Sequence, residues 1–458
     1  MQNGEGERLP SFCILHSSFC IMSSPSPKTL LVLSQVFVPD PASVGQHMAD
    51  VAFEMASRGH RVLVYTSARG YENPSNIYPK RETIRGVEIR RLGFAHFGKK
   101  NLLIRAFGTL SFMVQAIWIV LTTRNLGGIF FSTSPPLIGI AAMIGKWLRR
   151  VPIAYWAMDL NPDQLIAMGK ITKTSPTARV LETANRMILR NSSLVVALDR
   201  FMAERLRQRV PDIDRKMLVM PPWPHEAHLE PLPHRENPFR TRHDLADKFV
   251  IMYSGNHSPA NPLRTLLEAT LQFKDRDDIR FFFVGGGLGK KEVEAFASEH
   301  DVKNIVSLPY QPLAELRYSL SAADVHVVSL GQEMVGIVHP CKIYGAMTVG
   351  RPILFLGPRP SHVADILEEN PIGRQVSHGD VPACAAAIQS FLETPPATLA
   401  EMGDTAQRVL TQRFTQVHLC GRFCDALEAA LKMTPSLTVT TADQRSEHAT
   451  RQALPAAH

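Results

Sequence analysis

Short runs of consecutive apolar residues alternate along the chain with longer segments of helical periodicity. In the first half these runs lie at residues 29–34, 62–66, 128–131, 151–156 and 193–198. In the second half they lie at residues 249–254, 280–284, 304–308, 323–328 and 352–356. Continuous apolar runs of this length are typical of parallel strands buried on both faces. The alternation therefore predicts an α/β fold built on two parallel sheets.

Changes in composition divide the chain into segments. Residues 226–247 are rich in proline, histidine and charge and show little periodicity, so we predict a linker between domains at 28–225 and 248–404. Residues 433–458 are polar and are predicted to be disordered. Residues 1–27 differ from the rest and repeat Ser-Phe-Cys-Ile, which predicts a disordered or spurious extension, with translation starting at Met22.

Composition limits the classes of function. The 458 residues are 45% hydrophobic and 20% charged with a net charge of +8, which indicates a globular protein with an anionic partner. No nucleic-acid-binding motif accompanies this charge, and the six cysteines lack metal-ligand spacing, which favours a reducing cytoplasm. Solubility alone also explains such a charge.

The most apolar segment, residues 102–123, is interrupted by Arg105 and Gln115. We predict a core helix rather than a membrane span, and with residues 137–148 it offers a basic, apolar surface for the headgroup region of a membrane. Ordinary helix packing explains the same pattern.

Residues 329–352 are the most informative stretch. The strand at 323–328 leads into a polar loop with Glu333 and Gly336, then Pro340, a short helix at 342–347 and Gly350. Such a unit places backbone N–H groups at the carboxyl edge of a parallel sheet, where a phosphate or a sugar hydroxyl binds. Other strands end in comparable loops, at Gly255-Asn256, at Gly285 to Lys290 and at Asp159. No G-x-G-x-x-G occurs, which disfavours a dinucleotide enzyme.

The stretch Gly336 to Pro352 resembles the donor-sugar motif of family 4 glycosyltransferases, which have the GT-B fold of two Rossmann-like domains facing a cleft. It is most similar to the branch with G-x-x-x-P-S-K-hydrophobic-Y-G-x-x-x-x-G-R-P, which is associated with bacterial surface polysaccharides. The chain departs from the wider family where that family has two glutamates, since Ile337 and Gly345 stand there, and Cys341 replaces the serine.

The resemblance implies roles for individual residues. It implies catalytic roles for Asp159, Lys342 and Glu333, the nearest acid to the missing glutamates, although a helix N-cap is the structural alternative for Asp159. On the acceptor side it implies Ser134, Pro135 and His47. It implies donor-binding residues at Gly45, Gly255, Asn256, Gly285, Gly287, Lys290, Tyr310, Gly336, Pro340, Ile343 and Tyr344. No Asp-x-Asp pair follows a strand in the donor half, so no metal and no cofactor besides the nucleotide-sugar are expected.

These roles imply transfer of a sugar from a UDP- or GDP-sugar to a glycan or polyprenyl-linked acceptor, with retention of configuration. The helical segment 405–432 is expected to pack back on the first domain, as in other GT-B chains. We expect a cytoplasmic protein, peripheral on the inner membrane surface, with no nucleic-acid partner. A non-catalytic partner in a polysaccharide assembly complex and a nucleotide-sugar epimerase are the alternatives.

Overall fold

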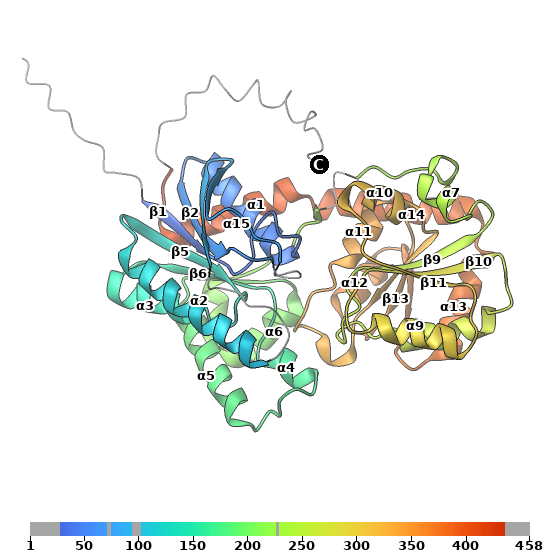
Figure 1. The fold of residues 1–458 in the computed structure, drawn as a ribbon, viewed down its shortest axis with the longest axis horizontal. Helices are drawn as coiled ribbons and strands as arrows, with labels where there is room; N and C mark the ends of the chain where they lie inside the picture. Colours follow the sequence, from blue (N-terminus) through green and yellow to red (C-terminus); the bar gives the residue numbers. More distant parts are fainter. Residues whose placement is uncertain (1–27, 71–74, 94–101, 226–228, 436–458) are drawn as a thin grey trace, which may run out of the picture.

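The computed structural model describes residues 28–70, 75–93, 102–225 and 229–435. The predictions for residues 1–27 and for 436–458 of the tail therefore lie outside the described residues. Two α/β lobes lie side by side, and the last helices run across their junction (Figure 1). The predicted pair of parallel sheets is confirmed.

The N-terminal sheet has the strand order β3-β4-β2-β1-β5-β6-β7-β8. Its strands are β1 (Thr29–Leu33), β2 (Arg61–Ser67), β3 (Arg81–Ile84), β4 (Val87–Leu92), β5 (Leu126–Ser132), β6 (Ile153–Ala157), β7 (Leu194–Ala197) and β8 (Met217–Val219). All neighbours are parallel except β3 and β4, an edge hairpin that the apolar runs did not reveal. In β4 the positions alternate between buried and half-buried, which is the pattern of a strand that is covered on one face.

The helices of this lobe are α1 (Ser43–Ser57), α2 (Leu102–Thr122), α3 (Gly139–Arg149), α4 (Asp163–Ala167), α5 (Pro176–Asn191) and α6 (Arg200–Arg209). Asp199 caps α6, as its position predicts, because its carboxylate accepts from the Met202 N–H at 2.8 Å. Ser175 caps α5 in the same way. Helix α2 packs on α3, and α3 in turn packs on β5 and β6.

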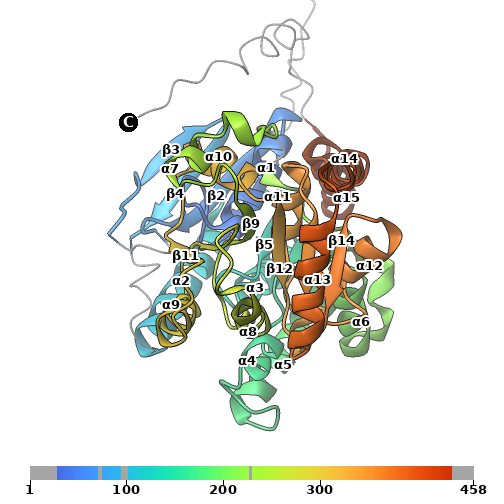
Figure 2. The same ribbon diagram turned by 90° about the vertical axis from the view of Figure 1, so that its right-hand side faces the viewer.

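The C-terminal sheet is wholly parallel, in the order β11-β10-β9-β12-β13-β14. Its strands are β9 (Phe249–Ser254), β10 (Ile279–Val284), β11 (Ile305–Leu308), β12 (Val325–Ser329), β13 (Ile353–Leu356) and β14 (Gly373–Val376). The helices are α7 (Pro238–Arg242), α8 (Arg264–Thr270), α9 (Lys290–Glu299), α10 (Leu316–Ser321), α11 (Lys342–Thr348), α12 (His362–Glu369) and α13 (Val381–Glu393). Helices α8 and α13 pack against each other beside this sheet (Figure 2).

The end of the chain forms α14 (Pro396–Arg413) and α15 (Gln416–Leu431) rather than one helix across 405–431. The break falls at Phe414, whose buried ring and φ of −126° take the backbone out of the helix. Helix α14 packs on α11, whereas α15 packs on α1 and on β5, β6 and β7. The break therefore lets the chain return from the second lobe to the first.

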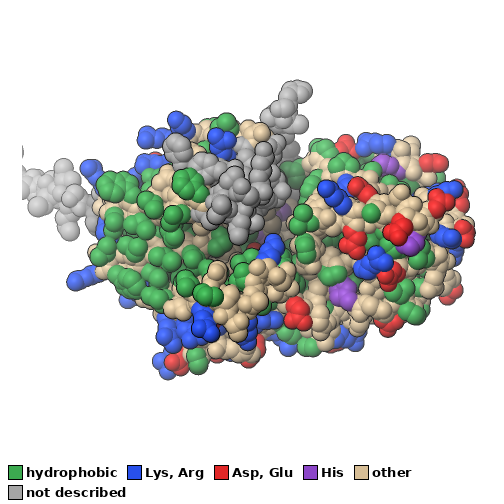
Figure 3. Space-filling view, turned by 60° about the horizontal axis from the view of Figure 1, so that its bottom comes forward, with side chains coloured by type: hydrophobic (Ala, Val, Ile, Leu, Met, Phe, Trp, Pro, Cys, Tyr) green, Lys and Arg blue, Asp and Glu red, His purple; other side chains and the backbone are tan. Residues whose placement is uncertain are grey.

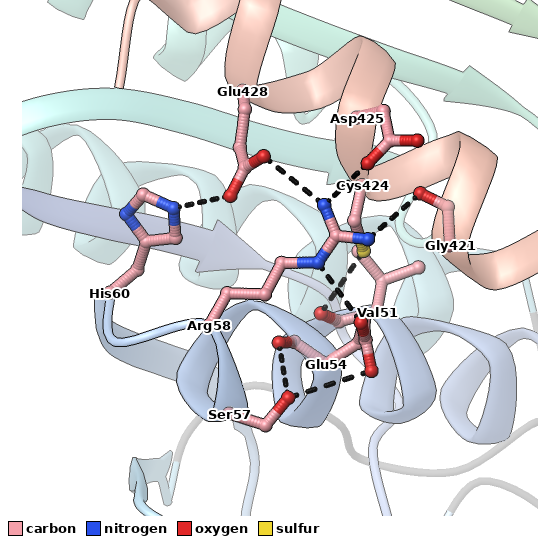
Figure 4. Close-up of polar contacts among 9 residues, drawn as sticks. All are labelled: Val51, Glu54, Ser57, Arg58, His60, Gly421, Cys424, Asp425 and Glu428. Atoms are coloured by element: carbon pink, nitrogen blue, oxygen red, sulfur yellow. Dashed lines mark hydrogen bonds and ion pairs between the residues drawn. The ribbon is translucent and has the colours of Figure 1, made fainter. Parts of the chain in front are cut away.

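A polar cluster holds α15 on the first lobe (Figure 4). The Arg58 guanidinium, just after α1, donates to Asp425 at 2.7 Å, to Glu428 at 3.1 Å and to the Gly421 carbonyl at 3.1 Å. The buried His60 ring lies 2.7 Å from the other Glu428 oxygen. One planar cation thus bonds three points along the same helix, a task that suits the fixed fork of arginine.

Candidate functional site

The loops that follow β9 and β10 meet at the carboxyl edge of the C-terminal sheet. The Gly255 N–H donates to Val284 O at 2.8 Å, and the His257 N–H donates to Gly286 O at 2.7 Å. A Cβ on Gly285 would lie 2.1 Å from Gly255 O, and Gly285 has a φ of +135°. Only glycine fits both requirements, so the two loops pack backbone against backbone.

Lys342 extends from the start of α11 into this junction. A Cβ on Gly255 would lie 2.5 Å from Lys342 Cε, and the Lys342 ammonium lies 5.3 Å from the centre of the Tyr253 ring. Burial lowers the pKa of Lys342 to about 8. No carboxylate among the described residues forms an ion pair with it. A half-buried cation of this kind is poised for an anionic ligand.

Other predicted donor residues surround the same loops. Gly287 lies against the exposed Asn256 side chain, and the half-exposed Tyr310 ring covers Gly286. The Lys290 ammonium donates to Gly285 O at 3.1 Å. The structure therefore brings the predicted set from both glycine loops together around Lys342.

Sequence reasoning missed His257, which is 1% exposed and lies beside this cluster. Its ring packs edge-on against Tyr253, and burial lowers its pKa, with Lys290 and Lys342 adding to the effect. Burial, with the two lysines adding to it, thus favours the neutral imidazole, which fills space behind the loops. Its place directly after Gly255-Asn256 was the only available signal.

Asp159 lies in the other lobe, just beyond β6, and is half-buried. Burial raises its pKa to about 6. It makes no capping bond to α4, whose N-cap position is Pro162. The structural alternative for Asp159, a helix cap, is therefore absent, and the carboxylate has a pKa suited to proton exchange near neutrality.

The loop after β12 joins the two lobes next to Asp159. The Leu160 N–H donates to Ile337 O at 3.0 Å, and the Arg205 guanidinium donates to Val335 O at 2.8 Å. Gly336 packs on the backbone of Phe201. The same segment thus carries Lys342 toward the glycine loops and contacts the chain beside Asp159.

Several other predicted residues lie elsewhere. Ile343 and Tyr344 are buried in the core at 0% and 1% exposure, and Pro340 is also buried. Only the backbone of these three residues could therefore contact a nucleotide-sugar. Glu333 is exposed in the short 3-10 helix Gln332–Met334, and its charge acts on Arg205 of the first lobe. Gly336 faces Phe201 rather than the glycine loops.

The remaining residues lie in the first lobe. Gly45 packs against the backbone of Phe37. The His47 ring is 2% exposed and bonds Trp223 O at 2.9 Å through Nε2. Ser134 accepts from the Gln35 N–H through its carbonyl, and Pro135 next to it is buried.

Comparison with known proteins identifies both lobes. Residues 43–223 match the model of the glycosyl transferase 4-like domain, and residues 235–409 match that of glycosyl transferases group 1. The chain is 23% identical over 389 residues to the probable glycosyltransferase WbjE of Pseudomonas aeruginosa, covering 84% of this chain and 94% of the relative. It is also 23% identical to the putative colanic acid biosynthesis glycosyl transferase WcaI of Escherichia coli, covering 80% and 92%.

Solved structures have the same fold. HepE of Anabaena in complex with UDP and glucose has a TM-score of 0.64 at 17% identity, with 88% of this chain and 100% of that chain covered. Sucrose-phosphate synthase of Thermosynechococcus elongatus has a TM-score of 0.68 at 19% identity, with the same coverage. These likenesses confirm the predicted GT-B fold. The chain therefore belongs to the family 4-type glycosyltransferases, whose two characteristic domains together account for most of its length.

Proposed function

We propose that the protein transfers a sugar from a UDP- or GDP-sugar to a glycan or polyprenyl-linked acceptor in the biosynthesis of a surface polysaccharide. One observation carries the proposal. The loop after β12 delivers Lys342 to the glycine loops of one lobe and bonds, through Ile337 O, to the residue after Asp159 in the other. One segment therefore connects the donor-side cation with the backbone beside the acceptor-side carboxylate. Two glycosyltransferase relatives, one of them assigned to colanic acid biosynthesis, and a structural neighbour solved with UDP support this substrate class.

The donor diphosphate would bind where the loops after β9 and β10 meet. Lys342 supplies a cation that is not neutralised by a carboxylate among the described residues, and Lys290 supplies a second one at the same loops. Backbone N–H groups around Gly255 add uncharged donors. Charge that develops on the leaving diphosphate is thereby stabilised by groups already in place. We propose that the transfer retains the configuration of the sugar and needs no obligatory metal.

Asp159 would face the acceptor. Its pKa of about 6 leaves it mostly ionised at neutral pH, so it accepts a hydrogen bond from the acceptor hydroxyl. The exposed Tyr310 ring beside Gly286 offers a flat surface for the nucleobase. Asp159 and Tyr310 thus orient the two substrates from opposite lobes.

The first lobe also carries an apolar face suited to a membrane surface. We call this surface the α2 face, and its exposed residues are Phe107, Leu110, Val114 and Trp118 of α2, Trp147 and Leu148 of α3, and Val180 and Met187 of α5. Figure 3 shows apolar side chains gathered on one face of the N-terminal lobe, with lysine and arginine side chains around them. In the part of the chain that the structure describes, no helix is long and apolar enough to cross a bilayer.

Charge favours a lipid occupant for the α2 face. Exposed basic residues surround it, namely Arg124, Arg150, Lys170, Lys173, Arg179, Arg186 and Arg190. A contiguous apolar patch with a basic rim binds the headgroup region of anionic membranes, and a polyprenyl-linked acceptor resides there. The proposed acceptor class and the proposed membrane contact therefore support each other.

A thermal-shift screen of nucleotide-sugars tests the donor proposal. One UDP- or GDP-sugar at a hundredfold its dissociation constant should stabilise the protein by about 2.7 kcal/mol. In Lys342→Ala that stabilisation should disappear, and transfer to a lipid-linked acceptor should fall by about 100- to 1,000-fold. Lys291→Ala is the matched control, because that lysine is exposed and one residue away from Lys290.

Two results would contradict the proposal. Stabilisation by no nucleotide-sugar would indicate a non-catalytic partner. Conversion of the nucleotide-sugar to its epimer without any acceptor would indicate an epimerase.

A further inference from the structure

Three side chains with metal-binding groups meet where the two lobes join, outside the glycine loops. Asp199 caps α6 of the first lobe, His339 lies in the loop before α11, and His362 is the first residue of α12. One ligand atom from each residue lies within 4.8 Å of those of the other two. The first lobe supplies the carboxylate and the second supplies both imidazoles.

Hydrogen bonds fix the orientation of this cluster. His339 Nδ1 lies 3.0 Å from the outer oxygen of Asp199, whose other oxygen caps α6. The Tyr344 hydroxyl lies 2.9 Å from His339 Nε2 and 3.1 Å from His362 Nε2. Tyr344 thus orients both rings, as an outer partner does for metal-bound histidines, and a bound cation would replace the proton that His339 Nδ1 and Asp199 share.

A cavity gives solvent access to the cluster. It has a volume of about 590 Å³ and is lined by Asp199 and His362 together with residues of both lobes and the α14–α15 break, such as Met220, Ile366 and Phe414. The His339 and Asp199 side chains are only 1% and 4% exposed. A cation can therefore reach this largely buried cluster through the cavity. Water from the cavity can complete the coordination of the cation.

The geometry points to a divalent-cation site of the zinc type, formed by Asp199, His339 and His362 across the junction of the two lobes. Two imidazoles and one carboxylate are ligands that zinc accepts, with a water as the fourth.

The site has a consequence for the positions of the lobes. A cation bound there would join α6 directly to the segment that carries Lys342, because His339 lies in the same loop. Metal occupancy would therefore resist separation of the lobes. This role is regulatory or structural and does not depend on the identity of the sugar donor.

The test is metal binding by the full-length protein after treatment with a chelator. Titration with Zn²⁺ should show one tight site per chain, a raised melting temperature, and with Co²⁺ the visible absorption of a low-coordinate nitrogen and oxygen site. Asp199→Asn keeps a good helix cap and removes the charge, and His362→Asn removes a ligand. Both should abolish this site, whereas Tyr344→Phe should weaken it by about 10- to 100-fold.

The matched control is His418→Asn, because His418 is exposed on α15. This variant should leave Zn²⁺ binding at the tight site unchanged, and it removes any weak binding of Zn²⁺ by His418 itself. Zn²⁺ binding that is only weak and multiple, or a tight site that persists in His362→Asn, would overturn the assignment. Far-ultraviolet circular dichroism of each variant verifies the fold, so loss of binding is not confused with unfolding.

Discussion

At the scale of single residues, the site depends on two groups whose pKa values burial moves toward neutrality. Burial raises the pKa of Asp159 to about 6 and lowers that of Lys342 to about 8. In both cases desolvation disfavours the charged form. Transfer needs the ionised carboxylate for the acceptor hydroxyl and the protonated ammonium for the diphosphate, so the active ionisation state prevails between these two values.

The pH dependence of kcat/KM should therefore be bell-shaped. The rate should rise as pH increases through about 6, because Asp159 loses its proton, and fall above about 8, because Lys342 loses its own. Initial rates of sugar transfer from pH 5 to 9 provide the measurement. In Asp159→Asn the lower limb should vanish along with most activity, and a lower limb that survives in this variant would contradict the role of Asp159.

At the scale of elements, strand ends and their loops define the donor side. Gly285 follows β10 directly, and its backbone packs against the backbone of Gly255. The backbone amides of both loops are therefore held in place by a contact that no side chain tolerates. Precision at this edge derives from loop packing rather than from the sheet itself.

Replacement of Gly285 by alanine should separate the two loops. The added Cβ would lie 2.1 Å from Gly255 O in an unfavourable backbone conformation, and we expect a loss of about 2–4 kcal/mol in stability together with loss of nucleotide binding. Urea unfolding and isothermal titration with UDP and GDP measure both. Gly93→Ala, where a Cβ would meet no atom of the described residues within 4 Å, should change neither.

Helix α2 is the second element with a specific consequence. Its inner residues, such as Phe112 and Val120, are fully buried, while Val114 and Trp118 of the opposite side are exposed. Each apolar side of a helix is normally covered by another apolar surface, so α2 is expected to contact two such surfaces. One is α3, and we propose that the other is lipid.

A charge placed on the α2 face should weaken membrane binding. Trp118→Glu, whose wild-type side chain is 70% exposed, should reduce sedimentation with phosphatidylglycerol vesicles without affecting stability. Val417→Glu is the control, since that residue is 85% exposed on α15, outside the α2 face. Equal binding of the two variants would exclude the α2 face as the contact.

At the scale of the whole molecule, the final helices hold the lobes together. The chain crosses from the second lobe to the first at Phe414, and the Arg58 cluster then holds α15 against α1 (Figure 4). The largest hydrophobic core contains residues of both lobes. Helix α15 contributes Phe423 and Leu427 to it. Removal of this attachment should therefore affect the entire first lobe.

Arg58→Ala should lower the free energy of unfolding by about 1–3 kcal/mol. The guanidinium is partly buried, and its loss would remove the hydrogen bonds to one Glu428 oxygen and to the Gly421 carbonyl, while His60 still bonds the other Glu428 oxygen. Chemical denaturation measures the loss, and limited proteolysis should show earlier cleavage near α15. Arg408→Ala on α14, where the exposed arginine bonds only its neighbour Thr405 among the described residues, should have little effect.

The two parallel sheets, most strand positions and the glycine loops could be predicted from the residues alone, because buried strands need continuous apolar runs and tight loops need glycine. It did not reveal the β3–β4 hairpin, whose exposed positions weaken the apolar signal. Packing of the folded chain, by contrast, places Lys342 against Gly255, Gly336 against Phe201, and Asp199 beside His339 and His362. Those contacts join residues far apart in the chain, and local periodicity carries no information about them.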